Sequence, residues 1–389
     1  MKGFSNRLNQ IEEYYFSHKL KEVKKLQMEG KPIINMGIGS PDLPPHPSVI
    51  EALCKTATEK NAHGYQNYQG IPELRKSFSD FYLDFYGVSL NPENEILPLI
   101  GSKEGILHVS LTFLNEGDYV LIPDPGYPTY SSVCKMLGVN IIYYQLREEN
   151  NWYPDFKELK KLDLSQVKIM WMNYPHMPTG AKATISLFEE SINFAKEHEL
   201  LLVHDNPYSF ILEESPKSIF QVSGAKETAI ELNSLSKTAN MAGWRVGCVT
   251  GNSAFIQAIT KVKSNVDSGM FLGIQNAAIS ALKLDRQWYS SLNKIYQKRR
   301  DLLREFATKL NLQYSKDTSG MFLWAKLPPG INCREFVDRL LYEKHIFLTP
   351  GDIFGIQGEG WVRLSLCVKD EEIKEAIERI DNLKISKHK

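Results

Sequence analysis

The sequence lacks the features that mark several large classes of protein. It has no net charge, since 46 Lys and Arg residues balance 46 Asp and Glu residues, so its overall charge would not attract nucleic acid or an anionic membrane. No apolar stretch approaches the roughly 20 residues that a membrane-spanning helix needs. The first residues, MKGFSNRLNQ, carry charges and lack the apolar run of a signal peptide. We therefore expect a cytoplasmic globular protein that acts on a small molecule, without a nucleic-acid or membrane partner.

Metal and nucleotide motifs are missing as well. The five cysteines are odd in number, widely scattered and never in a CxxC or Cys/His ligand spacing, which argues against a disulfide framework and a zinc site. The glycine spacing of an ATP-binding P-loop is absent, and GIGSPD (37–42) lacks the third glycine of the dinucleotide fingerprint. We expect no metal site, and ATP and NAD are disfavoured as ligands.

Hydrophobic patterning predicts an α/β fold. A chain of 389 residues with 42% hydrophobic residues can bury a large core, and its length suggests two domains. Short apolar runs alternate with amphipathic stretches, which predicts a large domain over 45–284 with a mostly parallel sheet flanked by helices. Residues 1–44 and 285–389 are expected to form a smaller α+β domain. The strands of the large domain are predicted at 96–101, 119–124, 140–146, 168–174, 200–205, 229–236 and 246–251.

Polar residues stand where several of these strands end, and ligands of open α/β sheets bind beyond the carboxyl ends of the strands. Gly101, Ser102 and Lys103 lead from a strand into a helical pattern, where backbone amides at the positive end of the helix dipole would suit a phosphate. A plain helix cap would look the same. The stretch is therefore a weak indication on its own.

Two charged residues are harder to explain by structure alone. Asp205 ends the apolar run LLLVHD, where a buried carboxylate needs a cationic partner, although an isolated aspartate is more often a helix cap or a loop residue. Lys237 follows a strand among small residues, with Arg245 nearby, and this setting favours the free amine, a nucleophile for carbonyls. A solvent-facing lysine after a turn is an equally good interpretation of the motif taken alone.

Seven motifs follow one another along almost the whole chain: GIGSPD (37–42), GYQNYQGIPELR (64–75), GSKEG (101–105), DPGYPTY (124–130), DNPY (205–208), SLSKTANMAGWRVG (234–247) and WVRLSL (361–366). Taken together and in this order, they resemble the class I/II pyridoxal-phosphate-dependent aminotransferases of fold type I. The short segments NMGIGSPDLPPHP and 263–282 resemble the subgroup with LL-diaminopimelate and broad aspartate-type aminotransferases.

The resemblance implies pyridoxal 5′-phosphate as cofactor and assigns residues to it. Lys237 would hold it as a Schiff base, Asp205 would pair with its ring nitrogen, and Tyr208 would bind its phenolic oxygen. Tyr127 would stack on the ring. The phosphate would be held by Ser102, Lys103, Ser234 and Arg245, and by Tyr65 of a second subunit, which implies a homodimer with shared sites.

The implied reaction moves an amino group between an L-amino acid and a 2-oxo acid by a ping-pong mechanism. Arg363 would clamp the substrate carboxylate, with Gly39 and Asn173 also at the substrate, and Lys237 would carry the proton as general base. Another enzyme on the same scaffold, such as a C–S β-lyase, is the alternative. A non-catalytic binding relative is disfavoured because Lys237, Asp205, Arg245 and Arg363 are all present.

One position departs from the family pattern. The usual Asn-Pro-Thr-Gly is replaced by Met177-Pro-Thr-Gly, and a thioether cannot donate the hydrogen bond that the asparagine gives to the phenolic oxygen. We expect a higher pKa for the Schiff base unless Asn173, His176 or a water compensates. His204, beside Asp205, is expected to point to the opposite side of its strand and is interpreted as structural.

Overall fold

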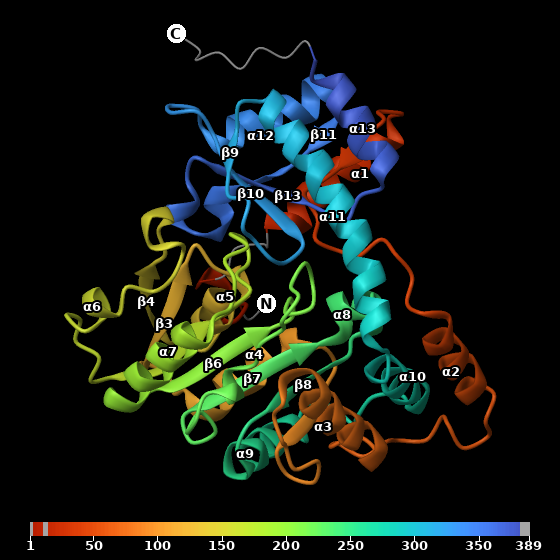
Figure 1. Ribbon diagram of the computed structural model, residues 1–389. Coiled ribbons are helices and arrows are strands. Elements are labelled where there is room, and N and C mark those ends of the chain that lie inside the picture. The colour runs from red at the N-terminus through yellow and green to blue at the C-terminus, as the bar shows by residue number, and fades with distance from the viewer. Residues whose placement is uncertain (1–2, 11–14, 382–389) are drawn as a thin grey trace.

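A seven-stranded sheet forms the larger layer of the fold. The computed structural model describes residues 3–10 and 15–381, and Figure 1 shows its arrangement. The sheet has the order β2-β8-β7-β6-β5-β3-β4, and all seven of its strands fall on the predicted apolar runs. The strands are β2 (Ile96–Leu99), β3 (Tyr119–Asp124), β4 (Asn140–Gln145), β5 (Val167–Met172), β6 (Leu201–Asn206), β7 (Ala229–Ser234) and β8 (Gly247–Thr250).

Strand direction is mostly parallel, as predicted, with one exception that the sequence did not indicate. Strands β4, β3, β5, β6 and β7 pair in parallel, whereas β8 runs antiparallel to both β7 and β2. The β7–β8 register pairs Ser234 with Gly247, and the β2–β8 register pairs Leu99 with the same glycine. The end of β7, the end of β2 and the beginning of β8 therefore lie together at one edge of the sheet.

Helices cover both faces of this sheet because alternate strand residues point in opposite directions. In β5, Ile169 and Trp171 join a buried cluster with side chains of α4, α5 and α9, whereas Met170 and Met172 join a cluster with α3 and α7. The helices around the sheet are α2 (Pro47–Ala57), α3 (Pro72–Tyr86), α4 (Ser102–Phe113), α5 (Pro128–Met136), α6 (Phe156–Leu159), α7 (Ile185–Glu197), α8 (Leu235–Thr238), α9 (Ser253–Lys263) and α10 (Leu272–Leu282).

A second, antiparallel sheet lies in the other part of the molecule, with order β12-β13-β10-β9. Figure 1 shows it in blue above the larger sheet, with the long helix α11 passing from one part to the other. A pair of short parallel strands, β1 and β11, adjoins it. These elements are α1 (Tyr15–Met28), β1 (Ile34–Asn35), α11 (Arg286–Lys309), β9 (Gln313–Tyr314), β10 (Phe322–Lys326), α12 (Cys333–Lys344), β11 (Ile346–Phe347), β12 (Thr349–Pro350), β13 (Trp361–Ser365) and α13 (Asp370–Arg379).

The fold class expected from the sequence is thus confirmed, while the domain boundaries at 45–284 and at 1–44 with 285–389 stay a prediction. Short 3-10 helices complete the described chain at Asn6–Gln10, Glu148–Asn150, Ile219–Gln221, Ala242–Trp244, Gly351–Phe354 and Ile356–Gly358. Within residues 3–10 and 15–381, no helix has the length and apolar character needed to cross a bilayer.

Candidate active site

A cavity of about 440 Å³ lies at the carboxyl ends of the parallel strands. Strand ends β5, β6 and β7, the start of α4 and strand β13 all contribute to its wall. Every residue assigned to the site from the sequence lines this cavity, apart from Tyr65. The lining residues that were predicted are Gly39, Ser102, Lys103, Tyr127, Asn173, Asp205, Tyr208, Ser234, Lys237, Arg245 and Arg363.

Tyr65 lies outside the cavity of its own chain. It precedes α3 and is 95% exposed, so its ring is available to contact another molecule. The sequence-based expectation placed this residue in the site of a second subunit. A single chain does not test that expectation, which stays a prediction.

One end of the cavity is positively charged. Gly101 has a φ of 81°, a left-handed conformation that favours glycine, and a Cβ there would lie 2.1 Å from Nη2 of Arg245. The absence of a side chain at Gly101 therefore lets the guanidinium approach the first turn of α4. Arg245 itself has a φ of 56° and donates from Nη1 to the Ala242 carbonyl at 2.9 Å, which fixes its direction.

The same end gathers a second cation and two hydroxyl groups. Burial and the positive charge of Arg245 lower the pKa of Lys103. Ser234 ends β7, and its Oγ accepts a hydrogen bond from the backbone N–H of Ser236, whose own hydroxyl lies 3.4 Å from Arg245 Nη1. Cations, hydroxyl groups and a helix N-terminus in one place suit a dianion such as a phosphate.

Asp205 provides a buried anion farther along the cavity. Its side chain is 5% exposed, and its Oδ2 accepts a hydrogen bond from the Tyr130 hydroxyl at 2.9 Å. Its Oδ1 has no hydrogen-bond partner among the described residues. Burial raises the pKa of this carboxyl to about 6, with the Tyr130 hydrogen bond and the charge of His204 acting in the opposite direction. An N–H donor on a bound ligand would satisfy the second oxygen.

The side chain of Lys237 is held by a hydrogen bond to the backbone on the opposite wall of the cavity. It lies on the short helix α8, and its Nζ donates to the Gly39 carbonyl at 2.5 Å. Burial, with contributions from Arg363 and Arg245, lowers the pKa of Lys237 to about 8. A substantial fraction of the amine is therefore unprotonated at slightly alkaline pH, as imine chemistry requires.

Aromatic rings form two walls of the cavity. Tyr127 contacts the edge of Tyr130 at 5.5 Å between ring centroids, and Tyr208 contacts the edge of Phe322 at 5.9 Å. Burial raises the pKa of both lining tyrosines, so each keeps its hydroxyl hydrogen as a donor. These walls suit a flat ring whose rim carries an oxygen acceptor.

Arg363 stands at the far end of the cavity on β13. Its guanidinium lies 4.0 Å from the ring centroid of Phe322 and 4.8 Å from that of Phe354, and Nη2 donates to the Gly37 carbonyl at 2.8 Å. Nη1 lies 3.3 Å from the sulfur of Met177. The packed rings hold the guanidinium in place, where it can face a carboxylate.

No residue directly replaces the hydrogen-bond donor that the family's asparagine supplies at the position of Met177. His176 is buried, is held by Thr179 through Nδ1 at 2.8 Å and does not line the cavity. Asn173 does line it, but Nδ2 donates to the Asp205 carbonyl at 2.6 Å and Oδ1 accepts from the Met177 backbone at 2.8 Å. Of His176 and Asn173, only Asn173 can offer a hydrogen to the cavity, from its side-chain amide. The hydroxyl of Tyr208 remains the stronger donor to the phenolic oxygen.

The residues of this cavity fit the cofactor that the resemblance implies. Pyridoxal phosphate presents a protonated ring nitrogen, a flat ring, a phenolic oxygen, an aldehyde carbon and a phosphate. The orphaned Oδ1 of Asp205, the aromatic walls, Tyr208, the amine of Lys237 and the cationic end match these groups in turn.

Several residues in or beside the cavity were not predicted. Tyr130 lies within the DPGYPTY motif, but nothing in the sequence indicated that its hydroxyl meets Asp205. Ser236 lies beside Lys237 and could have been included as a neighbouring hydroxyl. Four apolar lining residues carry no local signal, because they reach the cavity from distant segments: Phe16, Leu20, Ile38 and Phe322. Met177, which the sequence singled out as a departure from the family pattern, also lines the cavity.

Comparisons with known proteins agree with this geometry. Residues 31–380 match the family described as aminotransferase class I and II. Proteins named LL-diaminopimelate aminotransferase from Dehalococcoides mccartyi and Aquifex aeolicus are each 40% identical to this chain over 98% of its length, and over 98% and 99% of theirs. Substrate-bound BacF from Bacillus subtilis has a TM-score of 0.94 and 37% identity, with 98% of both chains covered. An aromatic aminotransferase from Pyrococcus horikoshii has a TM-score of 0.86 and 30% identity, with 94% of this chain and 98% of the other covered.

Proposed function

Because this chain belongs to the class I and II aminotransferase family, we propose that Lys237 is the residue that binds its cofactor and moves the proton at the substrate Cα. The protein is a pyridoxal-phosphate-dependent aminotransferase that transfers an amino group between an L-amino acid and a 2-oxo acid. The observation that carries the assignment to Lys237 is its amine, which lies in the cavity with a pKa lowered to about 8.

The proposed contacts follow from the groups already described. When bound, the cofactor withdraws electrons from the substrate Cα. Asp205 accepts a hydrogen bond from the ring nitrogen, Tyr208 donates to the phenolic oxygen and Tyr127 covers the ring face. The groups proposed to hold the phosphate are the start of α4 with Ser102 and Lys103, the hydroxyl of Ser234 and the guanidinium of Arg245.

Substrate is proposed to bind between Arg363 and Lys237. Arg363 holds the α-carboxylate, and the backbone at Gly39 lies close to it because no side chain intervenes: a Cβ at Gly39 would lie 2.2 Å from the Phe322 ring. Asn173 borders the same space. With the carboxylate fixed, the Cα–H bond faces the Lys237 amine, which removes the proton and later returns one.

Replacing Lys237 tests this assignment. In Lys237→Ala we expect the visible absorbance of the bound cofactor to change and the formation of 2-oxo acid from an amino donor to fall by about 10³-fold or more, since both attachment and proton transfer are lost. Lys261→Ala, which removes an exposed lysine of α9, should keep the spectrum and the activity of the unaltered enzyme. Full activity in Lys237→Ala would contradict the proposal. Ammonia released from a β-thio amino acid without any acceptor would instead favour the C–S β-lyase alternative.

The geometry supports an amino donor with a bulky apolar side chain. Asp205 is the only acid among the described residues that line the cavity, and the free wall is apolar, with Phe16, Leu20 and Ile38 beside Met177. Such a wall suits an aromatic or long aliphatic side chain. The names of the relatives at 40% identity favour a second candidate, LL-diaminopimelate, which carries charges at its far end.

A donor screen separates these two classes. With 2-oxoglutarate as acceptor, phenylalanine, leucine and methionine should give higher kcat/KM than LL-diaminopimelate or aspartate. If LL-diaminopimelate or aspartate gave the higher kcat/KM, the donor class named for the relatives would be favoured instead. The test is independent of the Lys237 assignment, because every donor needs the same lysine.

We also propose that the enzyme is a homodimer in which Tyr65 completes the phosphate site of the partner subunit. The exposure of Tyr65 supports this arrangement. Mixing Lys237→Ala subunits with Tyr65→Ala subunits should restore activity above that of either variant, because a mixed dimer contains one unaltered site. Unchanged activity after mixing, under conditions where subunits exchange, would contradict shared sites. A cytoplasmic location stays a prediction from the sequence.

A further inference from the structure

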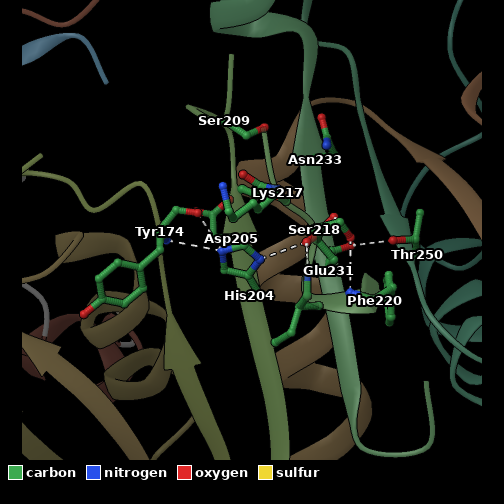
Figure 2. Close-up of polar contacts among 12 residues, drawn as sticks. Tyr174, His204, Asp205, Ser209, Lys217, Ser218, Phe220, Glu231, Asn233 and Thr250 are labelled. Atoms are coloured by element: carbon green, nitrogen blue, oxygen red, sulfur yellow. Dashed lines mark hydrogen bonds and ion pairs between the residues drawn. The ribbon is translucent and has the colours of Figure 1, made fainter. Parts of the chain in front are cut away.

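A fully buried ion pair lies one residue from Asp205. His204 on β6 and Glu231 on β7 are both 0% exposed, and Nδ1 of His204 lies 2.8 Å from Oε2 of Glu231. Figure 2 shows the two side chains pointing toward one another between their strands. Removing two charges from water costs several kcal/mol per ion unless the remaining polar groups are satisfied. The surrounding contacts therefore decide what the pair can do.

Glu231 is surrounded by hydrogen-bond donors. Besides His204, its carboxylate accepts from the Tyr82 hydroxyl at 2.7 Å, from Ser218 Oγ at 3.0 Å and from the Ile219 backbone N–H at 3.0 Å. The carboxylate is therefore held in place by contacts with four separate groups.

His204 is held between Glu231 and the backbone of Tyr174. Its Nε2 lies 2.8 Å from the Tyr174 carbonyl oxygen and accepts from the Tyr174 backbone N–H at 3.3 Å. With Nδ1 against Glu231, the ring is therefore fixed from both sides. The ring of Phe188, from α7, packs against it at 4.8 Å between centroids and shields it from water.

The pair joins three strand ends that border the cavity. Tyr174 follows Asn173 at the end of β5, His204 precedes Asp205 on β6, and Glu231 lies on β7 upstream of Ser234. Asn173 in turn donates to the Asp205 carbonyl. We propose that His204 is a positioning residue for amino-group transfer. Its ring, fixed by Glu231 and the Tyr174 backbone, holds the strand end that carries Asp205 toward the cofactor.

This inference rests on the proposed contact between Asp205 and the cofactor ring. The hydrogen bond between a carboxylate and a protonated ring nitrogen depends on distance and angle, so a residue that fixes the Asp205 strand end strengthens cofactor binding without touching the cofactor. Asp205 is the nearest acid on the same strand, and Tyr130 meets it from α5 on the opposite side. A merely structural ion pair would stabilise the fold but would have no specific effect through Asp205.

Equilibrium titration of the cofactor-free protein with pyridoxal phosphate, followed by absorbance, measures the effect. In His204→Gln we expect the cofactor dissociation constant to rise about tenfold at neutral pH, which corresponds to a modest coupling between neighbouring groups. Glu231→Gln weakens the contact that fixes His204 with no change of shape and should act in the same direction, so it serves if His204→Gln folds poorly. Ser218→Ala removes one hydrogen bond to Glu231 but leaves the ion pair, and its dissociation constant should stay within about twofold.

The decisive comparison repeats His204→Gln in an Asp205→Asn background. If His204 acts by placing the Asp205 carboxylate, the tenfold loss disappears there, while any loss of unfolding free energy persists. Equal losses in both backgrounds, or no loss in either single variant, would overturn the inference while leaving the proposed function intact. An unchanged dissociation constant in Asp205→Asn alone would instead refute the proposed role of Asp205, and the inference with it.

Discussion

The cofactor-free protein should become more stable when Asp205 is replaced by asparagine. The carboxylate is 5% exposed, and burial raises its pKa from 3.8 to about 6. Asparagine has the same shape without the charge, and its side-chain oxygen can still accept the hydrogen bond from Tyr130. The substitution therefore removes the cost of burying an anion and preserves the local packing.

The size and sign of this effect follow from the pKa. The folded state binds the proton more tightly than the unfolded chain does, so stability falls as pH rises from 3.8 to about 6, and the full cost is present above that range. One pKa unit corresponds to about 1.4 kcal/mol, so the buried charge costs about 3 kcal/mol at pH 8. At pH 5, where most of the Asp205 population is already protonated in the folded state, the cost is about half as large.

Urea denaturation of the cofactor-free proteins at both pH values measures this cost. Asp205→Asn should raise the free energy of unfolding by up to about 3 kcal/mol at pH 8 and by about half as much at pH 5. Asp84→Asn, at an exposed position on α3, should change it by less than about 0.5 kcal/mol at either pH. Saturating pyridoxal phosphate should reverse the order of Asp205→Asn and the unaltered protein. No gain at pH 8, or an equal gain at both pH values, would refute the reasoning.

Three further outcomes test other parts of the structure. Gly101→Ala should weaken pyridoxal phosphate binding by about tenfold or more in an absorbance titration, because the new Cβ displaces Arg245; unchanged affinity would contradict a phosphate contact by that guanidinium. Met177→Asn restores a hydrogen-bond donor and should lower the pH at which the visible absorbance of the bound cofactor titrates. An unchanged midpoint pH would show that the absence of this donor does not affect the cofactor. Thr184→Ala removes the side chain that accepts from the Leu187 N–H at the start of α7, and urea denaturation should show a loss of about 1 kcal/mol.

Much of the large sheet could be predicted because its strands are buried on both faces. Continuous apolar runs such as those of β3 and β6 are the direct result of helices packing on each side, so the apolar runs themselves located these strands. The N-cap at Thr184 was predictable because its side chain contacts the backbone only a few positions away in the sequence. The direction of β8 was not, because an apolar strand has the same pattern whichever way it runs.

The site was predictable where chemistry is concentrated at strand ends, and less so where contacts join distant segments. Asp205 and Lys237 stood out because a charge after an apolar run needs an explanation. The contact of Tyr130 with Asp205, and the packing of Phe322 on Arg363, depend on how separate strands and helices are placed. No sequence pattern records those placements.

The reversal of β8 limits which changes of chain length the enzyme can accept. Residues 235–246 connect Ser234 at the end of β7 to Gly247 at the beginning of β8. Ser234 and Gly247 are paired in the sheet, so the two ends of this segment lie side by side. Lys237 and Arg245 both lie in this segment, near its two ends. An insertion or deletion within it would move the lysine relative to the arginine, whereas a similar change in the surface turn before β4 would leave their spacing intact. We therefore expect natural variants of this enzyme to keep the number of residues between Lys237 and Arg245 constant and to differ in length in surface turns instead.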